Sequence, residues 1–358
     1  MAKFSEVLTI VNGRNQKQVV CDDGKYPIYG SGGIMGYAND YICKAETVVI
    51  GRKGSINKPI FVETPFWNVD TAFGLCANSE KLNPKYLYYF CEKFDFEKLN
   101  TTVTIPSLTK SNLLNVEIPL PNLEKQKQIV ELLDKITSLI SLRKQQLAKL
   151  DELVKAQFAN TFENDANFHT DYMENLSEFV TVGIANSATH AYAEHGVVML
   201  RNQNIKENHL DDTELVYIEP KFADKYKSKK LEANDILVTR TGYPGIACVV
   251  PQKYAGSQTF TTLIIRLKKG TNASSCYICH YINSSHGKKY VSGTKVGVAQ
   301  QNFGAKVLAK MPVIVPPIEL QNQFAALVER VDQQKQTIQQ SLEKLELLKK
   351  ALMQEYFG

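Results

Sequence analysis

Two segments of the chain repeat apolar residues at the i, i+3, i+4, i+7 spacing of an amphipathic helix. One runs from about 122 to 163 and the other from 317 to 357. The first has no glycine or proline between Asn122 and Phe162, so nothing in it interrupts a helix. Each segment predicts one helix about 60 Å long. The apolar positions are Ile129, Leu132, Leu133, Ile136, Leu139, Ile140, Leu147, Leu150, Val154 and Phe158 in the first segment, and Phe324, Leu327, Val328, Val331, Ile338, Leu342, Leu345, Leu348 and Leu352 in the second.

The remaining stretches, about 4–120 and 170–316, are rich in β-branched residues. Short runs of these residues lie between turn residues, as at 47–51 and 235–242, which is typical of strands. The sequence therefore predicts four parts. They are a first β-rich domain (1–120), a central long helix (121–163), a second β-rich domain (164–316) and a C-terminal long helix (317–358).

The two helical segments repeat each other at a constant offset of 195 residues. Residues 118–136 match residues 313–331, and the register holds to the ends of the helices. A weaker match between the β-rich stretches places Arg52 over Arg240. A period this long excludes a solenoid and implies two large half-molecules of common ancestry. The aligned pairs in the helical segments include Pro121 with Pro316, Glu124 with Glu319, Gln126 with Gln321, Gln128 with Gln323 and Phe162 with Phe357.

Helices of this length need a partner for their apolar stripe. The alternative, two separate surface helices each packed on its own domain, is disfavoured because about 40 residues is several times the mean helix length. The other copy of the repeat supplies a partner within the same chain. We expect an antiparallel pair, with the two β-rich domains at opposite ends. The predicted fold class is α+β: two β-rich domains joined by an intramolecular antiparallel coiled coil of two long helices, with pseudo-two-fold symmetry.

Composition changes this picture little. Hydrophobic residues make up 44% and charged residues 22% of the chain, as in ordinary globular proteins. No stretch approaches the roughly 18–20 apolar residues that cross a bilayer, and the N-terminal MAKFSEVLT lacks the apolar core of a signal peptide, so we expect no membrane partner. Seven scattered cysteines favour reduced thiols and a cytoplasmic location. The net charge of +5 permits an anionic partner without requiring one.

Several phrases of the sequence resemble one known family. They are YPIYGSGGIMGY at 26–37, the strand–loop pair VVIGRKG and ILVTRTG, and the helix entries IPLPNLEKQ and VPPIELQ. Together with the repeat, which spans nearly the whole chain, they are similar to the specificity subunit of type I restriction–modification systems. The resemblance implies two target-recognition domains that each read one half of a bipartite, asymmetric site in double-stranded DNA. It also implies that the paired helices set the spacing between the halves.

Reading base edges needs polar side chains on loops that can enter the major groove, and anchoring phosphates needs backbone amides, lysine or arginine. For each cation the alternative is a solvated surface charge, and for the GSGG phrase it is a tight turn without a ligand. Arg52 and Arg240 are favoured because both halves place an arginine before a Lys-Gly or Thr-Gly loop. The candidates are Ser31, Gly32, Gly33, Arg52, Lys53, Ser55 and Lys58 in the first domain, and Arg201, Asn202, Arg240, Thr241, Tyr243, Lys295, Gln300, Gln301 and Asn302 in the second.

An enzyme is the alternative class. The segments 29–33 (YGSGG) and 83–86 (NPKY) superficially match the nucleotide loop and the Asn-Pro-Pro-aromatic tetrad of an adenine methyltransferase. The first is not followed by a helix signal, and the second lacks its second proline and opens a helix, where proline is favoured. Neither β-rich stretch shows clustered carboxylates with a nearby lysine for metal-assisted cleavage, and no P-loop is present. We expect no catalytic residues.

The segment 276–280 (CYICH) spells a haem-attachment motif and half of a zinc site. A structural zinc needs a second ligand pair, and none occurs at a related spacing. The repeat aligns YICHYI with YLYYFC, so that Cys279 and His280 replace Tyr88 and Tyr89. We expect helix-packing residues here and no metal.

Two equivalent helix faces imply two copies of one partner. The resemblance identifies this partner as the methyltransferase (modification) subunit, with motor–nuclease (restriction) subunits joining the larger complex. No cofactor is expected on this chain, whereas S-adenosylmethionine, ATP and magnesium are expected on the partner subunits. The alternative is an orphan or decoy specificity-like protein that binds methyltransferase subunits without productive DNA reading. Candidate partner contacts, each with a solvated face as the alternative, are Lys125, Lys127, Glu131, Gln145 and Glu152.

Overall fold

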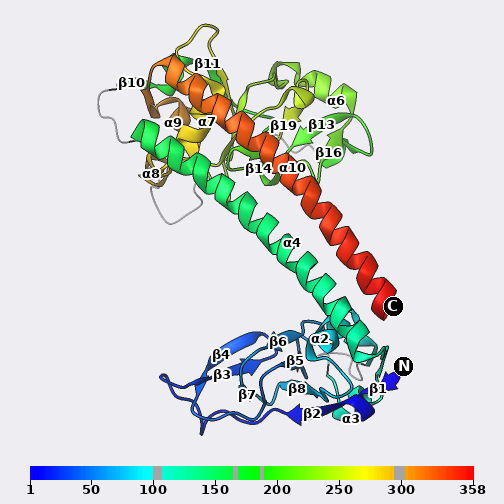
Figure 1. Cartoon of the computed structure of the whole chain (residues 1–358). Helices are drawn as coiled ribbons and strands as arrows, with labels where there is room; N and C mark the ends of the chain where they lie inside the picture. The colour runs from blue at the N-terminus through cyan, green and yellow to red at the C-terminus, as the bar shows by residue number, and fades with distance from the viewer. Residues whose placement is uncertain (100–106, 164–167, 186–188, 294–302) are drawn as a thin grey trace. The chain divides into compact units, whose positions relative to one another are not determined.

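The computed structural model describes residues 1–99, 107–163, 168–185, 189–293 and 303–358 (Figure 1). It divides into two compact units, with residues 1–146 and 338–358 in unit 1 and residues 147–337 in unit 2. Two long helices, α4 (Leu123–Phe158) and α10 (Ile318–Phe357), each contribute one end to each unit. Within the described residues, no helix combines the length and the apolar character needed to cross a membrane.

Unit 1 contains two main sheets, and apolar residues of both pack together in one cluster. The larger has the strand order β2-β8-β5-β6 and the smaller has the order β4-β3-β7, in which β3 and β7 run parallel. A short antiparallel pair, β1 with β9, joins the start of the unit to the segment before α4. Its elements are β1 (Ala2–Lys3), α1 (Phe4–Val7), β2 (Leu8–Asn12), β3 (Tyr26–Gly30), β4 (Gly33–Ala38), β5 (Thr47–Gly51), β6 (Ile60–Val62), β7 (Trp67–Asn68), β8 (Ala72–Ala77), α2 (Pro84–Lys93), a 3-10 turn (Phe96–Leu99), α3 (Lys110–Leu114) and β9 (Glu117–Ile118).

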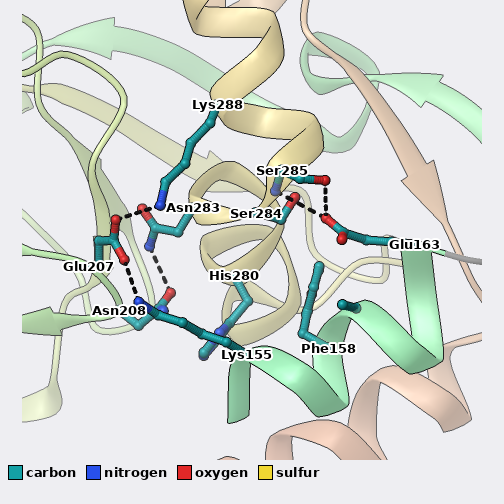
Figure 2. Close-up of a pocket in the computed structure, with 11 residues that line it drawn as sticks. Lys155, Phe158, Glu163, Glu207, Asn208, His280, Asn283, Ser284, Ser285 and Lys288 are labelled. Atoms are coloured by element: carbon teal, nitrogen blue, oxygen red, sulfur yellow. Dashed lines mark hydrogen bonds and ion pairs between the residues drawn. The ribbon is translucent and has the colours of Figure 1, made fainter. Parts of the chain in front are cut away.

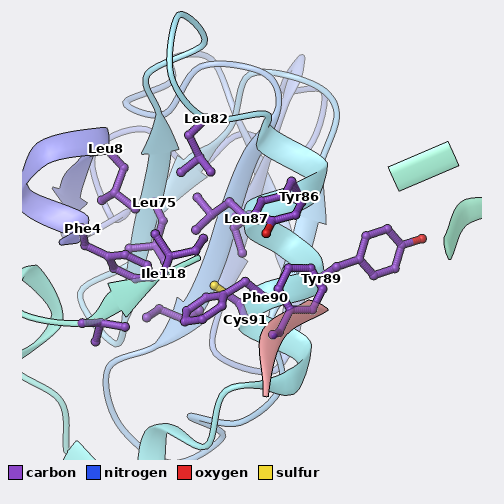
Figure 3. Packing of buried hydrophobic residues seen from close by; sticks show 14 of the residues in the cluster. Phe4, Leu8, Leu75, Leu82, Tyr86, Leu87, Tyr89, Phe90, Cys91 and Ile118 are labelled. Atoms are coloured by element: carbon purple, nitrogen blue, oxygen red, sulfur yellow. The ribbon is translucent and has the colours of Figure 1, made fainter. Parts of the chain in front are cut away.

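Strand β5 is buried along its whole length because it separates two apolar clusters. Successive side chains of a strand point to opposite faces. Val48 and Ile50 accordingly join the main core with α2, whereas Val49 joins a second cluster with Phe66. Figure 3 shows the main core, where Phe4 packs with its ring centroid 5.7 Å from that of Phe90. The central strand of the unit is therefore held from both sides.

Unit 2 repeats this plan with different loops. Its larger sheet has the order β11-β20-β17-β18, and its second sheet has the order β12-β16-β13-β19, again with one parallel pair, β13 with β19. Strand β17 is buried on both faces like β5: Ile236 and Val238 enter one cluster and Leu237 another. Its elements are a π-helical turn (Ala159–Glu163), β10 (His169–Tyr172), α5 (Met173–Leu176), β11 (Ser177–Val182), a 3-10 turn (Thr189–Ala191), β12 (Tyr192–Ala193), β13 (Val197–Leu200), a 3-10 turn (Asn202–Asn204), β14 (Ile205–Lys206), β15 (His209–Leu210), β16 (Val216–Ile218), α6 (Pro220–Lys225), a 3-10 turn (Lys227–Lys229), β17 (Ile236–Val238), β18 (Ala247–Val249), a 3-10 turn (Gln252–Tyr254), β19 (Gln258–Thr259), β20 (Leu263–Leu267), α7 (Ser275–Asn283), α8 (Ser285–Gly293), α9 (Ala305–Ala309) and β21 (Pro312–Val315).

The two long helices run antiparallel. In unit 1 the start of α4, with Ile129 and Leu133, shares a core with Met353 and Phe357 from the end of α10. In unit 2 the order is reversed, and Phe158 near the end of α4 packs on Phe324 near the start of α10, with ring centroids 5.4 Å apart. The predicted α+β fold, two β-rich domains on an intramolecular antiparallel helix pair, is confirmed.

The residues of the helical repeat perform the same task in each unit. Gln126 and Gln321, aligned in the sequence, are both fully buried, although glutamine usually lies at the surface. Each follows a proline-rich strand exit at the first turn of its long helix. Their side chains hydrogen-bond the segment before α2 in unit 1 and the segment before α7 in unit 2. The repeat therefore extends from the sequence to individual hydrogen bonds.

Candidate nucleic-acid interface

In unit 1 the loop after β5 presents Arg52 and Lys53. The Arg52 backbone is fixed, because its N–H donates to the Thr71 carbonyl over 2.8 Å and its carbonyl accepts from Leu108 N–H over 2.9 Å. Its side chain is exposed, with the guanidinium carbon 5.6 Å from the centroid of the Phe73 ring. A fixed backbone thus carries an exposed cationic group.

The GSGG phrase is the turn between β3 and β4, and it lies beside the loop after β5. A Cβ placed on Gly51 would lie 3.1 Å from the Cβ of Ser31. Strand β3 belongs to the smaller sheet and β5 to the larger one. Two loops from different sheets therefore meet at one place in unit 1, which brings together Ser31, Gly32 and Gly33 with the Arg52 loop.

Unit 2 brings together the corresponding two loops. Arg201 and Asn202 follow β13, and Arg240 and Thr241 follow β17. The Asn202 side-chain Nδ2 donates to the Thr241 Oγ1 over 2.9 Å, which joins the loops directly. Tyr243, in the same loop, is 84% exposed. The two-loop arrangement is thus shared by both units, whereas the residues in the loops differ.

Three buried polar atoms of these loops have no hydrogen-bond partner among the described residues: Arg201 Nε, Asn202 Oδ1 and Arg240 Nε. Leaving a buried donor or acceptor unpaired costs about 1–3 kcal/mol. The arrangement is nevertheless held in place, because Arg201 Nη2 donates to the Glu214 carbonyl over 2.9 Å. Unpaired polar groups on a fixed frame suit a polar ligand that completes their hydrogen bonds.

The remaining predicted DNA contacts are less informative. Lys58 is exposed and Ser55 is half-buried in the loop after β5. Lys295, Gln300, Gln301 and Asn302 lie outside the described residues. Asn204 was not among the predicted residues. It is buried and fixes the Arg201 loop by accepting from the Arg201 N–H over 3.0 Å and donating to the Asp211 carbonyl over 2.9 Å. An asparagine four residues after the end of a strand is too common a pattern to have revealed this role.

The predicted partner contacts on α4, Lys125, Lys127, Glu131, Gln145 and Glu152, are all exposed. The same helix also exposes four leucines, of which Leu142 is the most exposed at 57%. Leu132 and Leu139 of α4 and Leu348 of α10 were expected in the buried stripe, but all three are exposed because the buried seam between two helices is narrower than a full i, i+3, i+4, i+7 face. The exposed leucines of α4 are Leu132, Leu139, Leu142 and Leu153.

The Cys-x-x-Cys-His segment lies in α7, where Cys279 and His280 are buried. His280 packs between aromatic rings, 5.0 Å from Phe324 and 6.0 Å from Phe158 between ring centroids. Burial, with the nearby Lys335 ammonium, lowers the pKa of His280 to about 4. No group of three or more His, Cys, Asp or Glu suited to a metal ion occurs in the described part of the chain. The structure gives the segment a packing role.

Next to His280 lies a cavity of about 310 Å³ (Figure 2). Three of its charged groups are paired with one another, because Glu207 contacts the Nζ of Lys288 at 2.7 Å and the Nζ of Lys155 at 3.1 Å, and Glu163 accepts from the Ser285 hydroxyl over 2.8 Å. Burial raises the pKa of Glu207, but these two ammonium groups outweigh burial and hold the pKa below its usual value. These ion pairs therefore fasten the β14–β15 hairpin to α4 and α8, and the charged groups that line the cavity already have partners among the described residues.

Comparison with known proteins agrees with this architecture. The chain matches the family described as "Type I restriction modification DNA specificity domain" twice, over residues 1–152 and 170–347. It is 22% identical over 347 residues to a putative type I restriction enzyme specificity subunit of Haemophilus influenzae, which covers 92% of this chain and 86% of that protein. It is 22% identical over 318 residues to the EcoBI specificity subunit of Escherichia coli, which covers 80% of this chain and 66% of that protein. The fold is similar to the crystal structure of a type I restriction–modification S subunit from M. genitalium, with a TM-score of 0.65 at 14% identity over 100% of this chain and 95% of that one.

Two domains of one family on an antiparallel helix pair define a class of non-catalytic proteins that recognise DNA sequence. The chain belongs to the type I restriction–modification DNA specificity family. Its function is accordingly the recognition of DNA sequence, and the chain is not itself an enzyme.

Proposed function

We propose that each unit reads one half of a bipartite, asymmetric site in double-stranded DNA through its pair of loops. The observation that carries this proposal is the recurrence of one two-loop arrangement with different residues. Unit 1 offers Ser31 and Arg52, whereas unit 2 offers Asn202, Arg240 and Thr241. The same loop arrangement with different base-contacting side chains suits a DNA site whose two halves differ in sequence.

The unpaired polar atoms support the same proposal for unit 2. Arginine and asparagine are side chains that recognise guanine and adenine in the major groove by two hydrogen bonds at once. The Asn202–Thr241 bond uses the amide nitrogen of Asn202 and leaves the buried Oδ1 without a partner among the described residues. These atoms are buried, so the proposal requires the loop side chains to move on binding and let a base edge donate to Oδ1 and accept from the arginines.

The long helices serve two further purposes in this proposal. They fix the separation between the two half-sites, which on a duplex is a set length of about 34 Å per helical turn. Their exposed faces dock two methyltransferase subunits, one on each half of the repeat. The exposed leucines of α4, Leu132, Leu139, Leu142 and Leu153, lie among the polar candidates Glu131, Gln145 and Glu152. Apolar side chains rimmed by polar ones are typical of an interaction surface.

In this proposal the catalytic sites of the complex lie on the partner subunits. S-adenosylmethionine would bind the methyltransferase subunits, and ATP and magnesium would bind the partner subunits rather than this chain. Motor–nuclease subunits would join the larger complex. The cytoplasmic location expected from the cysteines fits this assembly and stays a prediction.

The test is to co-express the chain with its cognate methyltransferase subunit and map methylated adenines over the genome. We expect one bipartite motif with a fixed non-specific gap, absent when the chain is omitted. Methylation that does not depend on the chain would overturn the proposal. A stable complex that methylates no defined motif would favour the orphan or decoy protein instead.

A further inference from the structure

The β3–β4 hairpin of unit 1 exposes large apolar side chains at its tip. Ile34 is 55% exposed, Met35 is 64% exposed and Tyr37 is 48% exposed. Single exposed apolar residues need no explanation, but three in four positions of one hairpin mark an interaction site. In Figure 1 β3 and β4 lie on the side of unit 1 away from α2.

A β-bulge and two glycines set the backbone conformation around Ile34 and Met35. The register of the hairpin shifts between Ile28 and Tyr29, so that the strand β4 carries a bulge at this point. Glycines with positive φ flank the two residues, Gly33 at 121° and Gly36 at 155°, a conformation that other residues rarely adopt. A bulge at an exposed hairpin re-aims side chains and is a designed feature of a fold.

The surroundings of the tip are cationic. Residues 30–37 carry no charge, and residues 51–58 carry Arg52, Lys53 and Lys58 with no carboxylate. The Ser31–Gly51 contact places these two segments side by side. No carboxylate among the described residues lies within ion-pair distance of these three cations. An apolar tip beside unpaired cations complements a polyanion that also offers apolar groups.

Duplex DNA is such a partner. Its major groove admits a two-stranded β-ribbon, and the only apolar group on a base edge there is the 5-methyl group of thymine. We propose that the β3–β4 hairpin enters the major groove and that Ile34 and Met35 read thymine methyl groups in the half-site of unit 1, beside a base edge read by Arg52, while Lys53 holds a phosphate. This inference rests on the proposed function of unit 1 as a DNA reader and names how one half-site is read.

Unit 2 differs at the corresponding place. The loop after β13 carries Arg201, Asn202 and Gln203 and has no large apolar residue before Ile205. The two units therefore differ in chemistry: unit 1 adds apolar contact to its polar groups, whereas the loop after β13 in unit 2 offers hydrogen-bonding groups alone. A dependence on thymine methyl groups read by the hairpin is expected only in the half-site of unit 1.

The test uses the full chain and a library of random duplex DNA. The wild-type protein first selects its motif, and the half belonging to unit 1 is the one relaxed by Arg52→Ala. Each thymine in that half is then replaced by deoxyuridine, which removes only the methyl group. We expect at least one position to lose about 4-fold in affinity, the value of one buried methyl group. In Ile34→Ala or Met35→Ala the same replacement should have no effect, whereas Leu347→Ala, a matched change of an equally exposed residue on α10, should keep the wild-type sensitivity.

The possible outcomes distinguish a failure of the hairpin proposal from a failure of the proposed DNA-reading function. If the wild-type chain selects no motif, the proposed function fails. If it selects one whose unit 1 half lacks thymine or tolerates deoxyuridine at every position, only the hairpin inference fails. Equal sensitivity to deoxyuridine in wild type, Ile34→Ala and Met35→Ala would also overturn it, because the methyl groups would then be read elsewhere. A uniform loss of affinity for all sequences in the two variants would assign the tip to non-specific contact and contradict it as well.

Discussion

Gln126 and Gln321 make the same three hydrogen bonds in the two halves of the chain. The Oε1 of Gln126 accepts from the Asn83 N–H over 2.8 Å, and its Nε2 donates to the carbonyls of Lys81 and Pro121 over 3.0 and 2.8 Å. The Oε1 of Gln321 accepts from Ser274 N–H over 2.9 Å, and its Nε2 donates to the carbonyls of Asn272 and Pro316 over 2.8 Å each. Each amide ties the start of a long helix to the β-rich domain that precedes it.

We expect Gln126→Met to lower the free energy of unfolding of unit 1 by about 2–4 kcal/mol, because methionine keeps the volume but leaves one N–H and two carbonyls without their partner. The matched control is Gln128→Met, which changes the same residue type at an exposed position of the same helix. Urea denaturation of the two variants measures the difference. Equal stability would show that the buried amide is not what joins helix and domain.

The buried His280 predicts a pH dependence of stability. Its pKa is lowered from 6.5 to about 4 in the folded protein, so the unfolded chain binds the proton more strongly. The contribution of neutral His280 is complete above about pH 7 and is lost as the pH falls from 6.5 towards 4, by about 3 kcal/mol in total.

Carboxylates titrate in the same range, so the measurement is a comparison of urea unfolding between pH 7 and 4.5 in wild type and His280→Phe. The variant should lose less stability on acidification, because phenylalanine fits between Phe158 and Phe324 and binds no proton. His195→Phe, at an exposed histidine, should behave like wild type. Parallel pH profiles for His280→Phe and wild type would contradict the burial of a neutral imidazole.

The Asn202–Thr241 hydrogen bond predicts coupling between two loops that are far apart in sequence. Thr241→Val and Asn202→Ala should each weaken binding to a duplex carrying the target site. In the double variant the losses should not add, and the interaction energy should be about 0.5–3 kcal/mol. Additive losses would mean that the loops act independently. Thr170→Val, at an exposed threonine of β10, is the control that should leave binding unchanged.

Lys53 is expected to contact phosphate rather than bases. Lys53→Ala should weaken binding to all duplex sequences alike and reduce the slope of log affinity against log salt by about 1. Arg330→Ala, at an exposed arginine on α10, should leave the slope unchanged. A change in the preferred sequence of Lys53→Ala, with an unchanged slope, would instead assign Lys53 to base reading.

The pairing of the two long helices could be predicted from the sequence because it depends on apolar residues that recur at a regular spacing. The helical spacing in both segments and the alignment of Gln126 with Gln321 led to the antiparallel pair, and the packing role of His280 followed from its alignment with Tyr89. Patterns of this kind report which face of an element is buried. The spacing of apolar residues does not show how wide the buried face is. Leu139 was for this reason assigned to the buried stripe, although it is exposed.

The candidate interface was predictable only in part. Arg52 and Arg240 stood out because both halves place an arginine at the same point after a buried strand. The meeting of Asn202 with Thr241 depends on how two separate sheets pack, and no local pattern encodes that contact. The exposure of Met35 likewise depends on a bulge whose position follows from strand pairing.

The most direct test of the two-reader account compares Arg52→Ala with Arg240→Ala in the same experiment. Each full-length variant is co-expressed with the cognate methyltransferase subunit, and the methylated motif is mapped. The account predicts that each variant relaxes a different half of the motif, Arg52→Ala the half of unit 1 and Arg240→Ala the half of unit 2, with the spacing unchanged. Relaxation of the same half by both variants, or of neither half by either, would contradict it.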